Sequence, residues 1–466
     1  MNIYRISNLL LYLCDDMKQN LIIQDMTDGP ITRSLIRFAL PLMAGNLLQQ
    51  GYNLVDTIIV GKYLGADALA AVGTSYTLLI FITSIFIGIC MGCGTVLSIC
   101  FGAGDKEGMK TCQHASVWII GLVTLILTSL TQSMLPSILS WLHIPANLMD
   151  LSETYIGIVC IGMIFTAIYN FYAFSLRAIG NSLVPLYFLG IASLLNILFD
   201  LLFVILLHMS VDGIAIATVM AQALAAVGLA VYTHHRFPLL RLTKRTWHLP
   251  NRKSIRTIGI YSFLTCLQQS IMNFGILMVQ GLVNSFGVRV MAAFAAGVKI
   301  DTLAYMPVQD FGNAFSTFIA QNHGGGKHNR IRRGIQVGWI ITTIFSISIS
   351  LLVYFTAPWL MKIFVDQSET EILTIGTHYL RIEGSFYIGI GYLFLLYGFY
   401  RAVARPGMSL ILTVISLGTR VSLAYLLSAI PWIGVDGIWW AIPIGWILAD
   451  GVGCFYIRST LKTPLH

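Results

Sequence analysis

Four oxygen-bearing side chains lie inside apolar stretches of the first half of the chain. They are Asp56, Asn196, Asp200 and Thr218. An ionisable side chain in an apolar membrane helix costs roughly 2.5–3.5 kcal/mol to insert, so its presence there indicates a function. Carboxylate, amide and hydroxyl oxygens are the ligands that small hard cations prefer. Two neighbouring carboxylates in a medium of low dielectric could instead hold a proton.

The spacing of these residues is that of one site. Asn196 and Asp200 are four residues apart, which places both on one face of a helix. Asp56 lies about six residues, or roughly 9 Å, from the end of its apolar stretch. Asp200 and Thr218 flank the turn at 208–211 and lie about 10–12 Å deep. A structural alternative is that Asp56 caps local backbone and Asn196 bonds a neighbouring helix, but these helices hold no lysine or arginine at matching depth.

The composition requires that lipid covers most of the surface. Apolar residues make up 56% of the 466 and charged residues only 10%, against about 25% in soluble domains. Apolar stretches of about 17–25 residues, enough to cross a membrane as helices, recur along the whole chain. They lack the alternating period of a transmembrane barrel. We predict an all-α integral membrane protein with twelve transmembrane helices, over 35–61, 68–94, 113–136, 154–176, 183–207, 211–234, 255–285, 290–318, 333–358, 373–400, 408–430 and 436–457.

The positive charges predict the orientation. Most of the 28 lysines and arginines fall in the segments that share a side with the two termini. The positive-inside rule then places both termini in the cytoplasm and the chain in the plasma (inner) membrane. These charges lie on short loops without interleaved aromatic residues, so we expect lipid headgroups, and no nucleic acid, as their partner.

The chain contains an internal repeat. Val211-Asp-Gly-Ile214 recurs as Val435-Asp-Gly-Ile438, and Arg177-Ala178 recurs as Arg401-Ala402. Two further landmarks keep the same order: Leu48-Gln-Gln50 with Leu267-Gln-Gln269, and Gly102-Ala-Gly104 with Gly324-Gly-Gly326. A parallel repeat of this kind predicts two six-helix lobes related by a pseudo-two-fold axis along the membrane normal, with a cavity between them. The predicted segments are a cytoplasmic tail over 1–34, a first lobe over 35–235, a basic cytoplasmic linker over 236–254, a second lobe over 255–458 and a tail over 459–466.

The second half lacks the polar group of the first. The positions equivalent to Asp56, Asn196, Asp200 and Thr218 hold Gly275, Arg420, Ala424 and Ile442. Any coupling site therefore belongs to the first lobe. The second half has its own membrane charges, which we read as two neighbouring pairs, Lys299 with Asp301 and Arg381 with Glu383, either structural or functional. Asp310, just after Met306-Pro307, is expected to line the cavity.

Enzymatic function finds little support. Gly324-Gly-Gly-Lys327 is followed by His and Asn, so it is no ATP-binding loop. No metal-ligand spacing or nucleophile–base group occurs at membrane depth. Cys90-Met-Gly-Cys93 lies within an apolar helix, where small residues favour helix packing. We expect no enzyme, no metal beyond a coupling Na+, no cofactor other than that coupling ion (Na+ or H+), and a monomer.

The chain resembles the multidrug and toxic compound extrusion (MATE) family. The resemblance covers 30–460 and rests on Ala39-Leu-Pro41 through Asn53-Leu-Val-Asp56-Thr57, on the paired Arg-Ala and Val-Asp-Gly turns, and on Ser316-Thr-Phe-Ile-Ala-Gln-Asn322. It implies a secondary antiporter that expels organic cations and other amphiphiles in exchange for Na+ or H+. The DinF-like branch has a cation site whose aspartates, asparagine and threonine match Asp56, Asn196, Asp200 and Thr218.

Further positions follow from the same resemblance. Tyr52, Tyr155 and Asn170 match cavity positions, and with Asn53, Gln269 and Asp310 they form the predicted substrate cavity. Pro41 matches a proline associated with bending of the first helix. In the NorM-like branch a glutamate stands at the position of Gln269 and an aspartate on the tenth helix, which this chain lacks. The DinF-like comparison is therefore preferred.

Alternative functions remain at this point. The first is a flippase for lipid-linked oligosaccharides of the same superfamily, which would need arginines in its cavity; Arg420 alone supports it. The second is a membrane-embedded enzyme.

Overall fold

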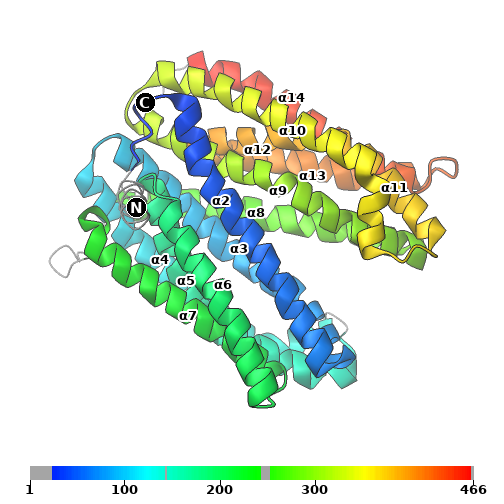
Figure 1. The fold of residues 1–466 in the computed structure, drawn as a ribbon. Coiled ribbons are helices and arrows are strands. Elements are labelled where there is room, and N and C mark those ends of the chain that lie inside the picture. The colour runs from blue at the N-terminus through cyan, green and yellow to red at the C-terminus, as the bar shows by residue number, and fades with distance from the viewer. Residues whose placement is uncertain (1–23, 142–143, 243–251, 463–466) are drawn as a thin grey trace, which may run out of the picture. The chain divides into compact units, whose positions relative to one another are not determined.

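The computed structural model describes residues 24–141, 144–242 and 252–462. The predicted tails over 1–34 and 459–466 and the linker over 236–254 fall partly outside these residues. All regular structure in the described residues is helical (Figure 1). The first half comprises α2 (Ile31–Ile59), η1 (Val60–Leu64), α3 (Ala66–Gly102), α4 (Lys106–Trp141), α5 (Ala146–Ala178), α6 (Leu183–Leu201), η2 (Leu202–Leu206), α7 (Val211–Arg236) and η3 (Pro238–Leu240). The second comprises α8 (Arg252–Asn284), α9 (Val288–Gly324), α10 (His328–Phe364), α11 (Thr370–Gly384), α12 (Tyr387–Ala402), α13 (Pro406–Ser428) and α14 (Asp436–Lys462).

The helices are long enough to cross a bilayer. Nine in the described part of the chain are both long and apolar enough to do so, and the pair α11 and α12, bent by 50°, makes a tenth. Helices α2 and α9 are also long but carry more polar residues, among them Asp56 and Asp310. The all-α, multi-pass prediction is therefore confirmed. The predicted helix over 373–400 is broken into two, because α11 ends at Gly384 and α12 begins at Tyr387.

The internal repeat is visible in the backbone. Helices α3 and α9 begin after glycines with positive φ, Gly65 at 89° and Gly287 at 98°. Each ends before a second such glycine, Gly104 at 68° and Gly326 at 65°. Side chains rarely adopt this left-handed conformation, which explains the glycines at these turns. Equivalent turns at equivalent positions support duplication of one six-helix unit.

The chain forms two compact units, each with its own packed interior. Unit 1 contains residues up to Leu79 and Gly104–Asn251, and unit 2 contains Ile80–Ala103 and everything from Arg252 onward. In unit 1, α5, α6 and α7 run side by side and α6 also packs on α2 (Figure 1). In unit 2, α12 packs on α9, and α13 packs on α8 and α14. The second half of α3 belongs to unit 2, so the two lobes of 35–235 and 255–458 stay a prediction.

Small residues allow α3 to approach α8 closely inside unit 2. A Cβ atom on Gly92 would lie 2.6 Å from the Ser262 Cα atom, and one on Gly88 would lie 2.5 Å from the Cys266 Cα atom. The Cys93 thiol and the Ser262 hydroxyl are 3.2 Å apart. Cys93 thus serves the close helix contact to which the sequence analysis assigned it.

Candidate cation-binding site

Three helices of unit 1 position the four predicted ligands. Asp56 lies near the end of α2, Asn196 and Asp200 lie on α6, and Thr218 lies on α7. Helix α6 packs against both α2 and α7, so it stands between the other two. The face that carries Asn196 and Asp200 is buried, while apolar residues such as Leu194 and Leu198 are exposed.

The structure brings the four side chains together in two pairs. The carboxyl groups of Asp56 and Asp200 lie within hydrogen-bonding reach of each other. The Asn196 amide lies 3.5 Å from the Thr218 hydroxyl oxygen, toward which it donates, and that hydroxyl donates at 3.0 Å to the Ile214 carbonyl oxygen. Because Asn196 and Asp200 are one helical turn apart, the two pairs are separated by roughly 6 Å along α6.

Burial makes this arrangement unfavourable for two negative charges. Asp200 is 0% exposed and Asn196 is 4% exposed, while Asp56 is half-buried. Among the ion pairs that the described residues form, none includes either carboxyl group. Apart from their mutual contact, one oxygen of Asp56 and both of Asp200 are buried without a hydrogen-bond partner in the described chain. Two adjacent carboxylates without a counter-charge are stabilised by a bound cation or a shared proton.

The helix ends beside the two aspartates are irregular. Helix α2 continues from Asp56 into the π-helical turn η1, and α6 continues from Asp200 into the π-helical turn η2. The two π turns contact each other. Such turns are rare and occur often at functional sites, because they rotate the following side chains out of the normal helical register. The η2 segment is wholly apolar and η1 contains Lys62, and neither sequence signals a π turn.

Tyrosines surround the carboxyl pair. Tyr155 on α5 is 7% exposed and interacts electrostatically with both Asp56 and Asp200. Tyr52 lies one turn before Asp56 on α2 and interacts with it. Tyr76 on α3 bonds the Asn53 side chain. Sequence reasoning missed Tyr76, which resembles many other aromatic residues of the membrane helices and becomes notable only through its contact.

Two residues inferred from the resemblance lie away from the pair. Asn170 is fifteen residues from Tyr155 on α5, which separates them by roughly 22 Å along the helix. Its amide donates to the Thr166 carbonyl oxygen at 2.8 Å. Pro41 is equally far from Asp56 on α2, buried within a continuous helix. Asn170 is therefore remote from the carboxyl pair, and its place in a cavity stays a prediction.

The remaining cavity residues belong to unit 2. Gln269 is half-buried on α8, and Asp310 is 4% exposed on α9. Their assignment to a substrate cavity stays a prediction.

Unit 2 also contains an acidic pair that the sequence analysis did not find. Asp301 on α9 and Glu383 on α11 are 2% and 3% exposed, and their carboxyl groups interact. Tyr387 donates a hydrogen bond to Asp301, and Tyr379 contacts both acids. Their basic neighbours in sequence, Lys299 and Arg381, are both exposed.

Helix geometry separates each acid from its basic neighbour in sequence. Residues two apart in an α-helix point to nearly opposite faces, whereas residues four apart share a face. Asp301 therefore shares a face with Tyr305, and Glu383 shares one with Tyr379. Arg381 instead lies over the ring of Tyr354. A search for acids four residues from tyrosines would have found the cluster.

A helical multi-pass fold that buries a pair of carboxyl groups, with no basic partner among the ion pairs of the described residues, is typical of membrane transporters. A family model described as MatE matches residues 41–202 and 262–426, and the chain belongs to this family of transporters. It is not an enzyme family.

Curated relatives match along nearly the full length. The probable multidrug resistance protein YpnP of Bacillus subtilis is 29% identical over 93% of this chain and 96% of its own length. The probable multidrug resistance protein NorM of Thermotoga maritima is 25% identical over 93% of this chain and 91% of its own. Among solved structures, a MOP superfamily transporter from Pyrococcus furiosus superimposes with a TM-score of 0.89 at 22% identity, covering 95% of this chain and 98% of that one. This last likeness shows the fold.

Proposed function

We propose that the protein exports organic cations and amphiphilic drugs in exchange for Na+ or H+. Membership of the MatE family and full-length similarity to proteins named for multidrug resistance support this proposal. Its ligands are drug-like small molecules, and transport proceeds by alternating access between two lobes.

The observation that carries the proposal is the buried Asp56–Asp200 pair. The two carboxyl groups lie together at the ends of α2 and α6 without a basic partner, beside the amide and hydroxyl of Asn196 and Thr218. A coupling ion stabilises this group by neutralising it, and a cationic substrate competes for the same negative potential. Linkage is reciprocal, so each ligand lowers the affinity for the other by the same factor.

Helix α2 supplies a hinge for the transition. Pro41 has no N–H group to donate to the carbonyl oxygen of Arg37, so α2 lacks one backbone hydrogen bond there. Bending at such a position changes how Asp56 meets Asp200. The match of these positions to the DinF-like branch supports assignment to that branch.

The charge distribution supports an orientation. Basic residues gather at the ends of the helices that share a side with the termini, and we place that side in the cytoplasm of a bacterial plasma membrane. The protein acts as a monomer with its two lobes in one chain.

Dye efflux from proteoliposomes tests the proposal. Vesicles are loaded with a cationic dye, and Na+ and pH gradients are imposed separately. Efflux driven by one or both gradients is expected. Failure of both gradients to move any cationic dye, together with accumulation of lipid-linked precursors in a deletion strain, would favour the flippase alternative instead.

A further inference from the structure

One acid lies deep in the membrane span of α14 in unit 2. The span runs from Asp436 to Ile457, so Asp450 lies roughly 21 Å along the helix from one end and roughly 10 Å from the other. An ionisable residue at such a depth is costly to insert and indicates a function. By the spacing of the repeated Val-Asp-Gly turns, the equivalent position of unit 1 is the buried Ala226, so this helix position does not require an acid for packing.

The carboxyl group of Asp450 lies against the first turn of α12. Its Oδ2 atom is 3.8 Å from the place that a Cβ atom on Gly389 would occupy, and Trp446, one turn earlier on α14, packs on the same glycine. Tyr397, farther along α12, interacts electrostatically with Asp450 and is hydrogen-bonded to the side chain of Thr413. The acid therefore lies where α12, α13 and α14 meet.

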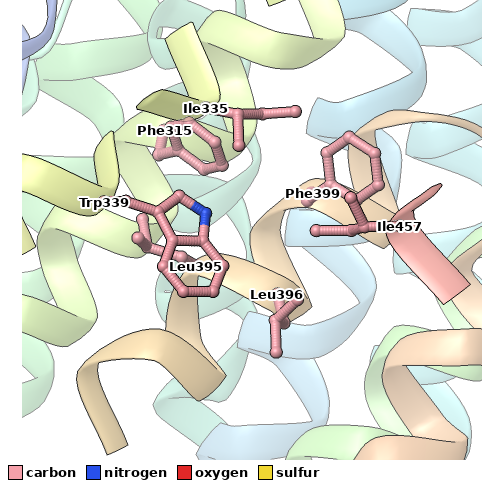
Figure 2. A pocket seen from close by; sticks show the side chains of 7 residues that line it. All are labelled: Phe315, Ile335, Trp339, Leu395, Leu396, Phe399 and Ile457. Atoms are coloured by element: carbon pink, nitrogen blue, oxygen red, sulfur yellow. The ribbon is translucent and has the colours of Figure 1, made fainter. Parts of the chain in front are cut away.

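Apolar side chains pack between α12 and α14 beyond this point. A Cβ atom on Gly453 would lie 2.7 Å from the Leu396 Cδ1 atom, so the two helices are in close contact one turn after Asp450. Figure 2 shows Leu396 and Phe399 of α12 together with Ile457 of α14 in a group of hydrophobic side chains. The carboxyl group thus has a hydrophobic layer on the side of the C-terminal end of α14.

No ion pair of the described residues includes Asp450. Its Oδ1 atom is buried without a hydrogen-bond partner in that part of the chain. Burial opposes a negative charge on this group, whereas the positive end of the helix dipole at the first turn of α12 favours one. Other titratable side chains of the helices packed on α14 contact it at other residues, namely Tyr400 at Gly453, Arg405 at Thr460, Arg420 at Gly445 and His378 at Asp436.

We propose that Asp450 is a second proton-carrying site, which takes up one proton from water and releases it again in each transport cycle. A proton needs a single oxygen atom, whereas a metal ion needs several ligands, and the described residues contain no cluster of three or more acidic, histidine or cysteine side chains. This role rests on the proposed antiport, to which it adds a proton carried by unit 2.

The position of Asp450 connects its proton to the shape of unit 2. The ionised carboxylate is attracted to the first turn of α12, and protonation removes that attraction. Helix α12 begins directly after the break at which α11 and α12 are bent by 50°. Proton exchange at Asp450 therefore acts on the contact that holds α14 to the start of α12, beside the bend.

Infrared spectroscopy of the full chain in lipid vesicles detects this proton without any gradient. A protonated carboxyl group whose carbonyl oxygen accepts no hydrogen bond absorbs at a higher frequency than one in water. In acidic buffer, the difference spectrum between the unaltered protein and Asp450→Asn should contain one such band. The difference between the unaltered protein and Asp366→Asn should not, because Asp366 is exposed in the connection between α10 and α11 of the same unit. Absence of the Asp450 band would overturn the proposal.

Proton release on addition of a cationic dye tests the role in transport. In weakly buffered solution, Asp450→Asn should release fewer protons per chain than the unaltered protein, by about one. Asp366→Asn should release as many as the unaltered protein, and Asp450→Glu, which keeps a carboxyl group, should restore most of the release. Equal release by the unaltered protein and Asp450→Asn, with dye efflux intact in both, would overturn the proposal and leave the antiport standing. Failure of the unaltered protein to move dye under either gradient would refute the antiport and this role with it.

Discussion

Neutralising Asp200 is the perturbation that bears most on the proposed coupling. Asp200→Asn keeps the size of the side chain and removes one charge from a position that is 0% exposed. A cation about 4 Å from a carboxylate gains about 4 kcal/mol at an effective dielectric constant of about 20. Loss of that attraction corresponds to a weakening of ion binding by about a thousandfold. Asp56→Asn should also weaken ion binding, but by a smaller factor, because Asp56 is only half-buried and its charge is partly screened by solvent.

The assay is dye efflux from proteoliposomes as a function of the driving ion. Asp200→Asn should lose efflux at ion concentrations that saturate the unaltered protein, while the variant still folds and inserts. Asp67→Asn is the matched control, since Asp67 is an exposed aspartate at the start of α3 in the same unit, and it should retain efflux. Full activity of both Asp56→Asn and Asp200→Asn would refute the reasoning.

Three further substitutions test other parts of the account. Thr218→Val keeps the shape of the side chain but removes the oxygen that the Asn196 amide approaches, and should raise the half-saturating ion concentration about tenfold, the equivalent of one hydrogen bond. Gly102→Ala should lower the stability of the purified protein by about 1–3 kcal/mol in thermal unfolding, because a Cβ atom there would lie 1.8 Å from the Gln321 carbonyl oxygen. Tyr387→Phe should cost about 1–3 kcal/mol in the same measurement, because Asp301 loses its donor.

Control substitutions of the same chemistry accompany the two stability predictions. Gly121→Ala places a Cβ atom on α4 with no other atom within 4 Å, so it should leave stability unchanged or raise it slightly. Tyr63→Phe removes an exposed hydroxyl at the end of η1. A loss of stability as large in the controls as in Gly102→Ala and Tyr387→Phe would contradict the packing and hydrogen-bond arguments.

The sequence predicts the helical membrane fold because the solvent imposes it. Lipid requires long apolar helices, and these can be recognised from the composition and length of the apolar stretches alone. The candidate cation site can be predicted for a related reason. Asp56 and Asp200 are rare charged residues among apolar neighbours, and their predicted depths in the membrane match. Helical spacing then brings Asn196 to the same face as Asp200.

Features that depend on tertiary contacts cannot be predicted from composition and helical spacing. Asp301 and Glu383 each have a basic residue two positions away in sequence, which suggested local ion pairs, whereas the folded chain pairs the two acids with each other. The break between α11 and α12 falls at Gly384 and Ser385, a type of residue pair at which helices often kink, so the sequence contains a local signal for it that the predicted helix over 373–400 overlooked. The π turns after Asp56 and Asp200 have no such local residue pattern.

The central claim is that an ion binds at the Asp56–Asp200 pair. A direct measurement of ion binding tests this claim. Purified protein in detergent is titrated with radioactive sodium, and proton release on addition of a cationic dye is recorded in weakly buffered solution. We predict saturable sodium binding or stoichiometric proton release in the unaltered protein, and neither in the Asp56→Asn/Asp200→Asn double variant. Undiminished sodium binding or proton release in the double variant would place the coupling ion elsewhere and contradict the account.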